Sequence, residues 1–254
     1  MNMSIQVLTL LYAMAAGAAP DAAAEKSSRP GSEPVTDAVS RSTSRPRLTP
    51  AQPTPQASRM LYQPPRRGAP RTRTGGGTRT TGEWISMTVL APEDTGLTTS
   101  AQPALYWQLT SATTAKFEFV LSDERVPAPV WRESFTGPLA PGVHALGMKT
   151  AGVSLLPGVT YRWSVAIVRD AAQRSRDIVS SGTVEYVAPE PAFAARIAAA
   201  APEERAAVYA AGGYWYEAVD ALQAWLAAHP GDARALADRT ALLDQVGLGA
   251  SGSR

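Results

Sequence analysis

The sequence predicts an α+β fold in which a β-sandwich precedes a small group of helices, and two patterns along the chain carry this prediction. From residue 83 to about residue 190, short runs alternate apolar and polar residues, with Pro and Gly between the runs. After Pro189 the apolar period lengthens to about 3.6 residues, and Ala, Leu, Glu and Arg become frequent. The first pattern is typical of half-buried strands, and the second is typical of amphipathic helices.

The chain begins with a segment typical of exported proteins. An apolar run from Ile5 to Ala19 has the length of a signal peptide, with small residues that suit a signal peptidase at its end. We therefore expect residues 1–24 to be a signal peptide and the mature protein to be periplasmic or extracellular, with no transmembrane span. No Lys or Arg precedes the run. A membrane anchor is thus the lesser alternative, although the run is short for a span.

Residues 25–82 are predicted to be a disordered, basic linker rich in Pro, Arg and Gly. They contain eleven Lys or Arg, three Asp or Glu, and few large apolar side chains. Such a composition cannot bury enough apolar surface to offset the entropy of ordering the chain, and recurring prolines favour extended polyproline II segments. From residue 83 onward thirteen Lys or Arg meet eighteen Asp or Glu, so the predicted folded part is mildly acidic.

Seven strands are predicted between residues 83 and 190. Three of them place large apolar side chains on one face and should supply the core: Leu105, Trp107 and Leu109; Phe117, Phe119 and Leu121; and Tyr161, Trp163, Val165 and Ile167. The others cover Trp84–Leu90, Val130–Phe135, Val143–Met148 and Ile178–Val187. About seven strands with Pro- and Gly-rich turns favour an immunoglobulin- or fibronectin-like antiparallel sandwich, with an open barrel as the lesser alternative.

One local motif supports the sandwich. Leu155–Tyr161, with Pro157 and Gly158 in its turn, is similar to a tyrosine corner, in which a Tyr early in a strand bonds back to upstream backbone. Tyr161 is therefore expected to be structural, and a phenol presented to a ligand is the lesser alternative.

Residues 191–248 are predicted to form a small tetratricopeptide-like helical hairpin plus one helix. A first helix opens near Pro202 and closes at Gly212-Gly213, and two more follow over Trp215–Ala228 and Ala233–Val246. The spacing of a tetratricopeptide unit is met by Tyr209, Gly213, Ala218, Leu222 and Pro230. Such a unit buries its apolar face only against a neighbour, so we expect it to pack on the sandwich, residues 83–190. Residues 249–254 are expected to be a disordered tail.

Several short motifs occur together in this chain: Pro64–Pro70 with Gly75–Arg79, Leu90–Glu93 with Gly96–Thr98, Phe117–Leu121, Thr160–Trp163, and Glu203–Arg205 with Tyr209 and Trp215-Tyr216. Over residues 62–248 the combination resembles a family of exported bacterial proteins, prominent in cyanobacteria, that is catalogued only as a domain of unknown function. The resemblance implies export and an envelope setting, but no activity, substrate or catalytic residue. It also implies a family disulfide, whose positions here hold Gly82 or Glu83 and Arg169.

The residue types that carry common catalytic and metal chemistry do not form recognisable motifs. The chain has no cysteine, its two histidines, His144 and His229, lack a metal-ligand spacing, and no Gly-x-Ser-x-Gly motif occurs. Adjacent carboxylates at Asp123-Glu124 and Glu203-Glu204 point apart on a turn or a helix start. We therefore predict no catalytic, cofactor-binding or metal-binding residue. A hydrolase remains an alternative, and it requires two buried acidic side chains that face each other.

A first candidate site is an Arg- and Gly-rich segment before the first predicted strand. Its backbone N–H groups and guanidiniums could hold a phosphate or sulfate, and its members are Arg71, Arg73, Gly75, Gly76, Gly77 and Arg79. The more ordinary interpretation is a flexible tether, because the lysine and glycine spacing of a nucleotide-binding loop are missing. The lack of interleaved aromatics and the export signal argue against a nucleic-acid partner.

A second candidate site is a group of aromatic residues in the helical region, Tyr214, Trp215, Tyr216 and Trp225. Aromatic side chains often anchor a partner protein. The alternative is that they pack the hairpin on the sandwich.

These observations lead to an expected function of a general kind. We expect a non-enzymatic, extracytoplasmic protein-interaction or envelope-associated module, whose partner is an unidentified protein or envelope component. One alternative is an anion- or glycan-binding envelope protein that uses the arginine-rich segment, and the other is a hydrolase with an unrecognised carboxylate site.

Overall fold

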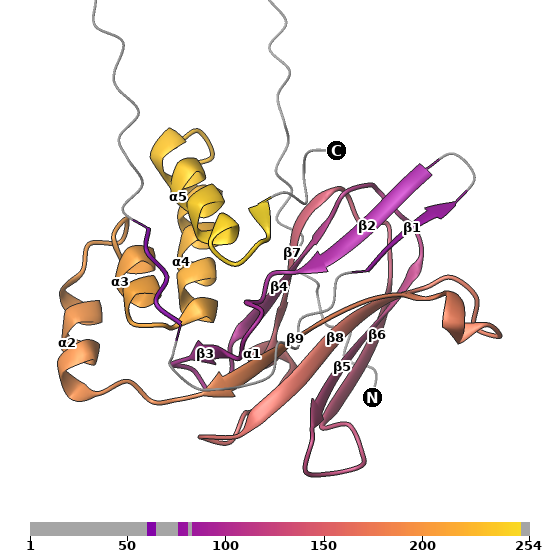
Figure 1. Ribbon diagram of the computed structural model, residues 1–254, viewed down its shortest axis with the longest axis horizontal. Helices are drawn as coiled ribbons and strands as arrows, with labels where there is room; N and C mark the ends of the chain where they lie inside the picture. The colour runs from indigo at the N-terminus through magenta and orange to yellow at the C-terminus, as the bar shows by residue number, and fades with distance from the viewer. Residues whose placement is uncertain (1–59, 65–75, 81–82, 250–254) are drawn as a thin grey trace, which may run out of the picture. The chain divides into compact units, whose positions relative to one another are not determined.

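A computed structural model of the protein describes residues 60–64, 76–80 and 83–249, with side chains at 60–64 and 85–249 (Figure 1). The predicted signal peptide, most of the predicted linker and residues 250–254 lie outside the described residues, so these assignments stay predictions.

The described residues form an α+β fold with two β-sheets. The first sheet has the order β1 (Gly76–Thr80), β2 (Glu83–Val89), β4 (Ala104–Leu109) and β7 (Gly142–Gly147). The second has the order β3 (Gly96–Thr98), β9 (Ile178–Tyr186), β8 (Thr160–Val168), β5 (Lys116–Asp123) and β6 (Trp131–Thr136). Neighbouring strands are antiparallel except β3 and β9, which are parallel.

Alternation along the strands brings apolar side chains of both sheets into one core. Met87 and Trp107 of the first sheet and Phe119 and Trp163 of the second are fully buried members of one hydrophobic cluster. In β4 the buried and half-buried positions alternate strictly, as expected when successive side chains point to opposite faces of a sheet. Burial of these large side chains is the main stabilising contribution to the two sheets.

Each of the seven predicted strand ranges contains a strand, and two further strands, β1 and β3, were not predicted. β1 begins with Gly76 and Gly77, for which the sequence favours a flexible tether, and its five residues pair with β2. β3 has only three residues and pairs with β9, more than eighty residues further along the chain. Both strands depend on a partner strand rather than on a pattern of their own.

The predicted hydrogen bond at Tyr161 is present. The Leu156 N–H donates to the Tyr161 hydroxyl at 3.2 Å, and the turn between them contains Gly158 with a positive φ of 69°. Tyr161 itself is buried at the start of β8. Its role in this structure is to close the turn that leads into the strand.

The helices of the described chain are α1 (Met148–Ala151), α2 (Pro191–Ala199), α3 (Arg205–Ala211), α4 (Trp215–Ala228) and α5 (Ala233–Asp244), with a 3-10 turn η1 (Arg174–Arg176). α4 has the predicted ends, and α5 ends two residues before the predicted Val246. None of these helices, in the part of the chain that is described, is long and apolar enough to cross a membrane.

Side chains at the start of α4 fasten this helix to both sheets. The Trp215 Nε1–H donates to the carbonyl of Leu90, next to β2, at 2.8 Å. The Tyr216 hydroxyl donates to the carbonyl of Thr183 on β9 and accepts from the Trp163 Nε1–H on β8, both at 2.8 Å. These buried bonds satisfy polar groups that would otherwise be costly in the core.

Candidate binding site on the helices

A cavity of about 140 Å³ lies among α3, α4 and α5, and we call it the acidic cavity. It is lined by Pro202, Glu203, Ala206, Ala221, Leu222, Trp225, Asp232, Arg234, Ala235 and Asp238. Three of these residues are alanines, one from each helix, and their small side chains leave the space between the helices open. The cavity is therefore large enough for the end of one long side chain from a partner.

Asp232 fixes one wall of the acidic cavity. Its Oδ1 accepts the backbone N–H groups of Arg234 and Ala235 at 2.9 and 3.1 Å, so it caps the start of α5. Its Oδ2 accepts the Trp225 Nε1–H at 2.7 Å. The bond from Trp225, followed by the bond from Ala235, lowers the pKa of Asp232, so the carboxylate stays ionised.

Trp225 is held in place from two sides. Its indole donates to Asp232 and its ring stacks on His229 with centroids 4.0 Å apart. An aromatic wall next to carboxylates is a surface that attracts cations, because the ring face carries negative partial charge.

The charges around the acidic cavity do not balance. Glu203, Asp232 and Asp238 contribute three negative charges, and Arg234 contributes one positive charge. The Arg234 Nε lies 3.8 Å from the Asp238 Oδ2. The remaining excess of two negative charges favours a cationic group in the cavity.

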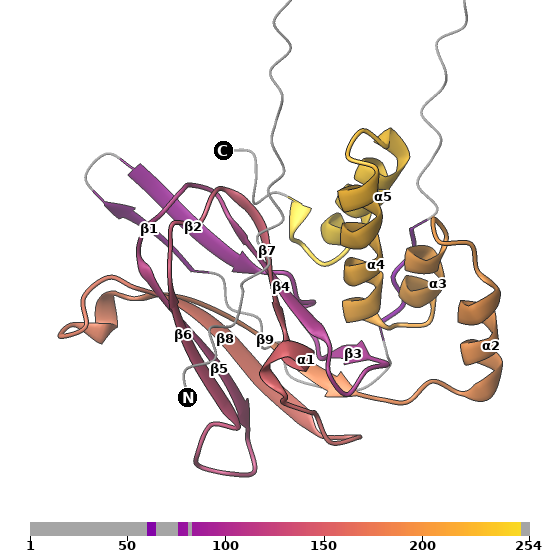
Figure 2. The same cartoon turned by 180° about the vertical axis from the view of Figure 1, so that it is seen from behind.

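A short extended piece of the chain lies on the same helices, and we call residues 60–64 the docked segment. Figures 1 and 2 both show it, in indigo, beside α3 and α4. The Gln63 N–H donates to the Ala210 carbonyl at 3.1 Å. The Gln245 side chain accepts from the Tyr62 N–H at 2.8 Å and donates to the Met60 carbonyl at 2.9 Å. The docked segment therefore bridges the last turn of α3 and the end of α5.

The side chains of the docked segment alternate between buried and exposed. Met60 and Tyr62 are 6% and 7% exposed, whereas Leu61 is 57% exposed. The Tyr62 ring meets the edge of Trp215 at a centroid distance of 5.0 Å. The sequence predicts a disordered linker at these residues, and their burial corrects that prediction. Two apolar side chains are too few to change the composition of a long basic stretch, so the composition did not indicate this contact.

The Tyr62 hydroxyl is buried and has no hydrogen-bond partner among the described residues. Burial, and to a lesser extent the charge of Asp94, raises the pKa of Tyr62 well above its ordinary value. The ring of Tyr62 is thus well accommodated, but its hydroxyl is not.

A buried carboxylate lies where α4 meets β3. The Thr98 hydroxyl donates to the Glu217 Oε1 at 2.5 Å, whereas the Oε2 has no partner among the described residues. Burial raises the pKa of Glu217, and the bond from Thr98 offsets part of that effect. One turn further along α4, Asp220 accepts the Tyr106 hydroxyl. These contacts hold α4 against β3 and β4.

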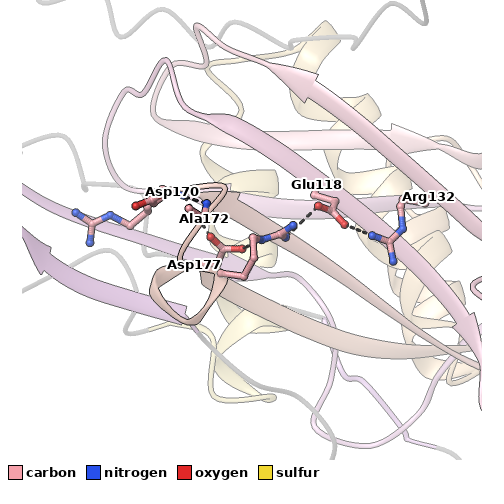
Figure 3. Close-up of polar contacts among 7 residues, drawn as sticks. Glu118, Arg132, Asp170, Ala172 and Asp177 are labelled. Atoms are coloured by element: carbon pink, nitrogen blue, oxygen red, sulfur yellow. Dashed lines mark hydrogen bonds and ion pairs between the residues drawn. The ribbon is translucent and has the colours of Figure 1, made fainter.

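Figure 3 shows a second polar cluster, on β5, β6 and the β8–β9 connection. Glu118 accepts from Arg132 at 2.5 Å and from Arg174 at 3.0 Å, and the Arg174 Nε also donates to Asp177 at 2.6 Å. The two carboxylates are therefore separated by a guanidinium and do not face each other across an open space. The cluster ties the β8–β9 connection to β5 and β6, and it is not the acid pair that the hydrolase alternative requires.

The predicted aromatic residues do not form one surface. Trp215 and Tyr216 are 0% and 1% exposed and pack the helices on the sheets, which is the alternative given above. Tyr214 is also buried and stacks on Phe193 at 5.2 Å. Only Trp225 lines the acidic cavity.

The predicted anion site is described only in part. Arg71, Arg73 and Gly75 lie outside the described residues, whereas Gly76, Gly77 and Arg79 lie on β1. Successive N–H groups of a strand point in opposite directions, so those of Gly76 and Gly77 do not converge on one anion. The site as a whole stays a prediction. Within the described ranges no three His, Cys, Asp or Glu side chains are grouped as metal ligands.

Apart from Trp225, the residues of the acidic cavity and of the docked segment are not among the site residues predicted from the sequence. Asp232 follows Pro230-Gly231 at a helix start, which is a recognisable capping signal. Glu203 is predicted from the sequence only to lie at a helix start. Met60 and Tyr62 offered no signal, because their partners lie about 150 to 180 residues away.

Comparison with known proteins places the chain in a family. The family model described as Domain of Unknown Function (DUF928) matches residues 68–253, and no curated protein matches the chain. The matched range covers most of the chain and confirms the resemblance to a family catalogued only as a domain of unknown function. The chain therefore belongs to the DUF928 family.

Proposed function

We propose that the protein is a non-enzymatic, extracytoplasmic interaction module that binds a basic segment of a partner protein in the acidic cavity. The observation that carries the proposal is this cavity of about 140 Å³, with three carboxylates and one guanidinium in its lining. A lysine or arginine side chain matches its charge, and the Trp225 indole offers a face for cation–π contact.

The strand arrangement supports an immunoglobulin-like sandwich as the scaffold. Apart from the short strands β1 and β3, seven antiparallel strands divide between the two sheets, three in one and four in the other. The Tyr161 hydroxyl bonds to the upstream Leu156 N–H, which is the geometry of a tyrosine corner. Sandwiches of this kind commonly display binding surfaces.

The helices support a tetratricopeptide-like unit. α3 and α4 are joined through Gly212 and Gly213, the latter with a φ of 80°, and Ala218 is fully buried where a small residue lets paired helices approach. α5 follows Pro230-Gly231 and stands where the first helix of a further unit would begin. Units of this type present concave surfaces between their helices to partners.

A charge reversal with a matched neighbour tests the proposal. Glu203 lines the acidic cavity and Glu204 does not, although both are exposed at the same turn. In the mature protein, Glu203→Lys should lower the affinity for an arginine-bearing peptide tenfold or more, measured by calorimetry at low ionic strength. Glu204→Lys should bind like the unsubstituted protein. Equal losses in both variants would indicate only a general charge effect, and retained binding by Glu203→Lys would contradict the proposed site.

A photo-crosslinking residue at Arg234 extends the test to envelope extracts. Adducts that form with the unsubstituted chain should disappear when Glu203→Lys is added and should persist with Glu204→Lys. Adducts that are indifferent to both substitutions would argue against the acidic cavity as the contact.

A further inference from the structure

We infer that the surface under the docked segment is a peptide-binding groove that the chain fills with its own residues 60–64. We propose that a partner segment can replace the docked segment. This partner segment is extended and carries an apolar residue, one spacer residue, and then an aromatic residue without a hydroxyl.

The first reason is that the helices hold the main chain of the docked segment. Three hydrogen bonds reach its backbone: Gln63 N–H to the Ala210 carbonyl, Tyr62 N–H to the Gln245 side chain, and the Gln245 side chain to the Met60 carbonyl. Backbone groups are common to every sequence, so any extended chain can make these bonds. In peptide recognition such bonds supply affinity, and pockets for alternate side chains supply specificity.

The second reason is the alternation of the side chains. Met60 and Tyr62 point into the helices and Leu61 points to solvent, with exposed fractions of 6%, 7% and 57%. The groove therefore accepts two side chains of the bound segment, and the side chain of the residue between them points to solvent. The aromatic pocket is formed in part by Trp215, which meets the Tyr62 ring edge-on.

The third reason is that the docked segment fits imperfectly. The buried Tyr62 hydroxyl has no partner among the described residues, and an unpaired buried hydroxyl costs roughly 1–3 kcal/mol. A phenylalanine would fill the same pocket without this cost. A foreign segment with Phe at this position thus has an advantage that the chain's own segment lacks.

The covalent connection sets the strength of the internal competitor. Residues 65–75 join the docked segment to β1. Because the docked segment and the groove belong to one chain, a partner segment competes with an intramolecular occupant, whose effective concentration does not fall on dilution. A partner segment must therefore fit the groove better than the docked segment does, by enough to overcome this intramolecular advantage.

The groove and the acidic cavity are separate sites on the same helices. The groove uses Ala210, Trp215 and Gln245, none of which lines the cavity. The Glu203→Lys test of the proposed function therefore leaves this inference unaffected, and failure of one does not imply failure of the other.

The direct test measures peptide binding to the full mature chain. The probe is a fluorescent peptide that copies residues 57–64 with phenylalanine in place of Tyr62, and binding is followed by anisotropy. A Met60→Ser/Tyr62→Ser variant, whose internal segment has lost both anchors, should bind the probe at least tenfold more tightly than the unsubstituted protein. Leu61→Ser, at the exposed spacer, should match the unsubstituted protein. A folded double variant that does not bind, or binding that is equal in all three proteins, would overturn the inference.

A second measurement covers the case in which the double variant does not fold. Because the chain has no cysteine, cysteines at the exposed Leu61 and Ala224 can carry a unique pair of spin labels. Saturating probe peptide should broaden the single distance between the labels, and a peptide with serine at both anchor positions should not. An unchanged distance would contradict the proposal. A change that depends on protein concentration alone would overturn it in favour of exchange between two copies.

Discussion

At the scale of single residues, two buried tyrosines illustrate how hydrogen bonding decides the value of a polar side chain. Tyr216 donates to the Thr183 carbonyl and accepts from the Trp163 indole, whereas Tyr62 has a buried hydroxyl without a partner among the described residues. Burial raises the pKa of both well above the ordinary value. Both rings contribute apolar burial, but only the Tyr216 hydroxyl joins the helices to the sheets.

This difference leads to a matched pair of predictions. Tyr216→Phe removes two buried hydrogen bonds and takes away the acceptor of the Trp163 N–H in the core, so the free energy of unfolding should fall by about 2 kcal/mol or more. Tyr62→Phe removes no hydrogen bond to the described residues and should leave the free energy of unfolding unchanged or slightly higher. Urea denaturation of both variants checks the pair. Equal losses in the two would mean that the hydroxyl of Tyr62 has a partner after all.

Glu217 predicts a dependence of stability on pH. Burial raises the pKa of this carboxyl in the folded state, so the folded protein binds the proton more tightly than the unfolded chain. The contribution of the protonated Glu217 carboxyl to the free energy of unfolding is complete below its unfolded-state pKa and is lost as the pH rises through its folded-state pKa. Glu217→Gln should therefore gain stability relative to the unsubstituted protein as the pH rises from about 4, near the ordinary pKa of glutamate, toward neutral. Denaturation midpoints across this range test it, with the exposed Glu204→Gln as control; parallel profiles for all three proteins would refute the prediction.

At the scale of elements, strands and helices with a strong internal pattern could be predicted and elements defined by distant partners could not. Trp107 and Trp163 lie on alternating strands whose faces are evident in the sequence, and α4 has its predicted ends. β3 forms because it pairs in parallel with β9, and the docked segment is held by hydrogen bonding to the Gln245 side chain. The same reason explains the site: Trp225 was a candidate from its residue type, but the acidic cavity depends on how three helices assemble.

The helices are expected to depend on the sheets for their fold. Trp215 and Tyr216 donate hydrogen bonds to the carbonyls of Leu90 and Thr183, which belong to the sheet region. A fragment from Pro191 to Arg254 lacks these partners, leaves both aromatic rings exposed, and has a size at which a single core is only marginally stable. Circular dichroism should show little helix in the fragment and one cooperative transition in the full mature protein. A sharp thermal transition in the fragment would instead establish the helices as an independent domain.

At the scale of the whole molecule, the expected interaction role requires export. The apolar run over residues 5–19 motivates this expectation, and the acidic cavity and the groove would then face partners outside the cytoplasm. The two surfaces lie on one set of helices, so a single partner could engage both or two partners could engage them separately.

Cell fractionation with N-terminal sequencing tests export. We expect the mature protein outside the cytoplasm, beginning at Ala19 or Glu25, because small residues at these points suit signal peptidase. Leu10→Arg/Leu11→Arg, which interrupts the apolar run, should retain the uncleaved chain in the cytoplasm. An uncleaved, unsubstituted protein in the cytoplasmic fraction would contradict the expectation.

The docked segment also determines how the folded protein bears mechanical load. Because residues 60–64 are fastened to α3 and α5, tension applied to the chain before Met60 reaches these few contacts before it reaches the pairing of β1 with β2. These three hydrogen bonds and two side chains would then be expected to yield before the two sheets separate. If the N-terminal part of the chain is anchored while the folded part is held by a partner, stretching would uncover the groove, and residues 60–64 would act as a force-sensitive release.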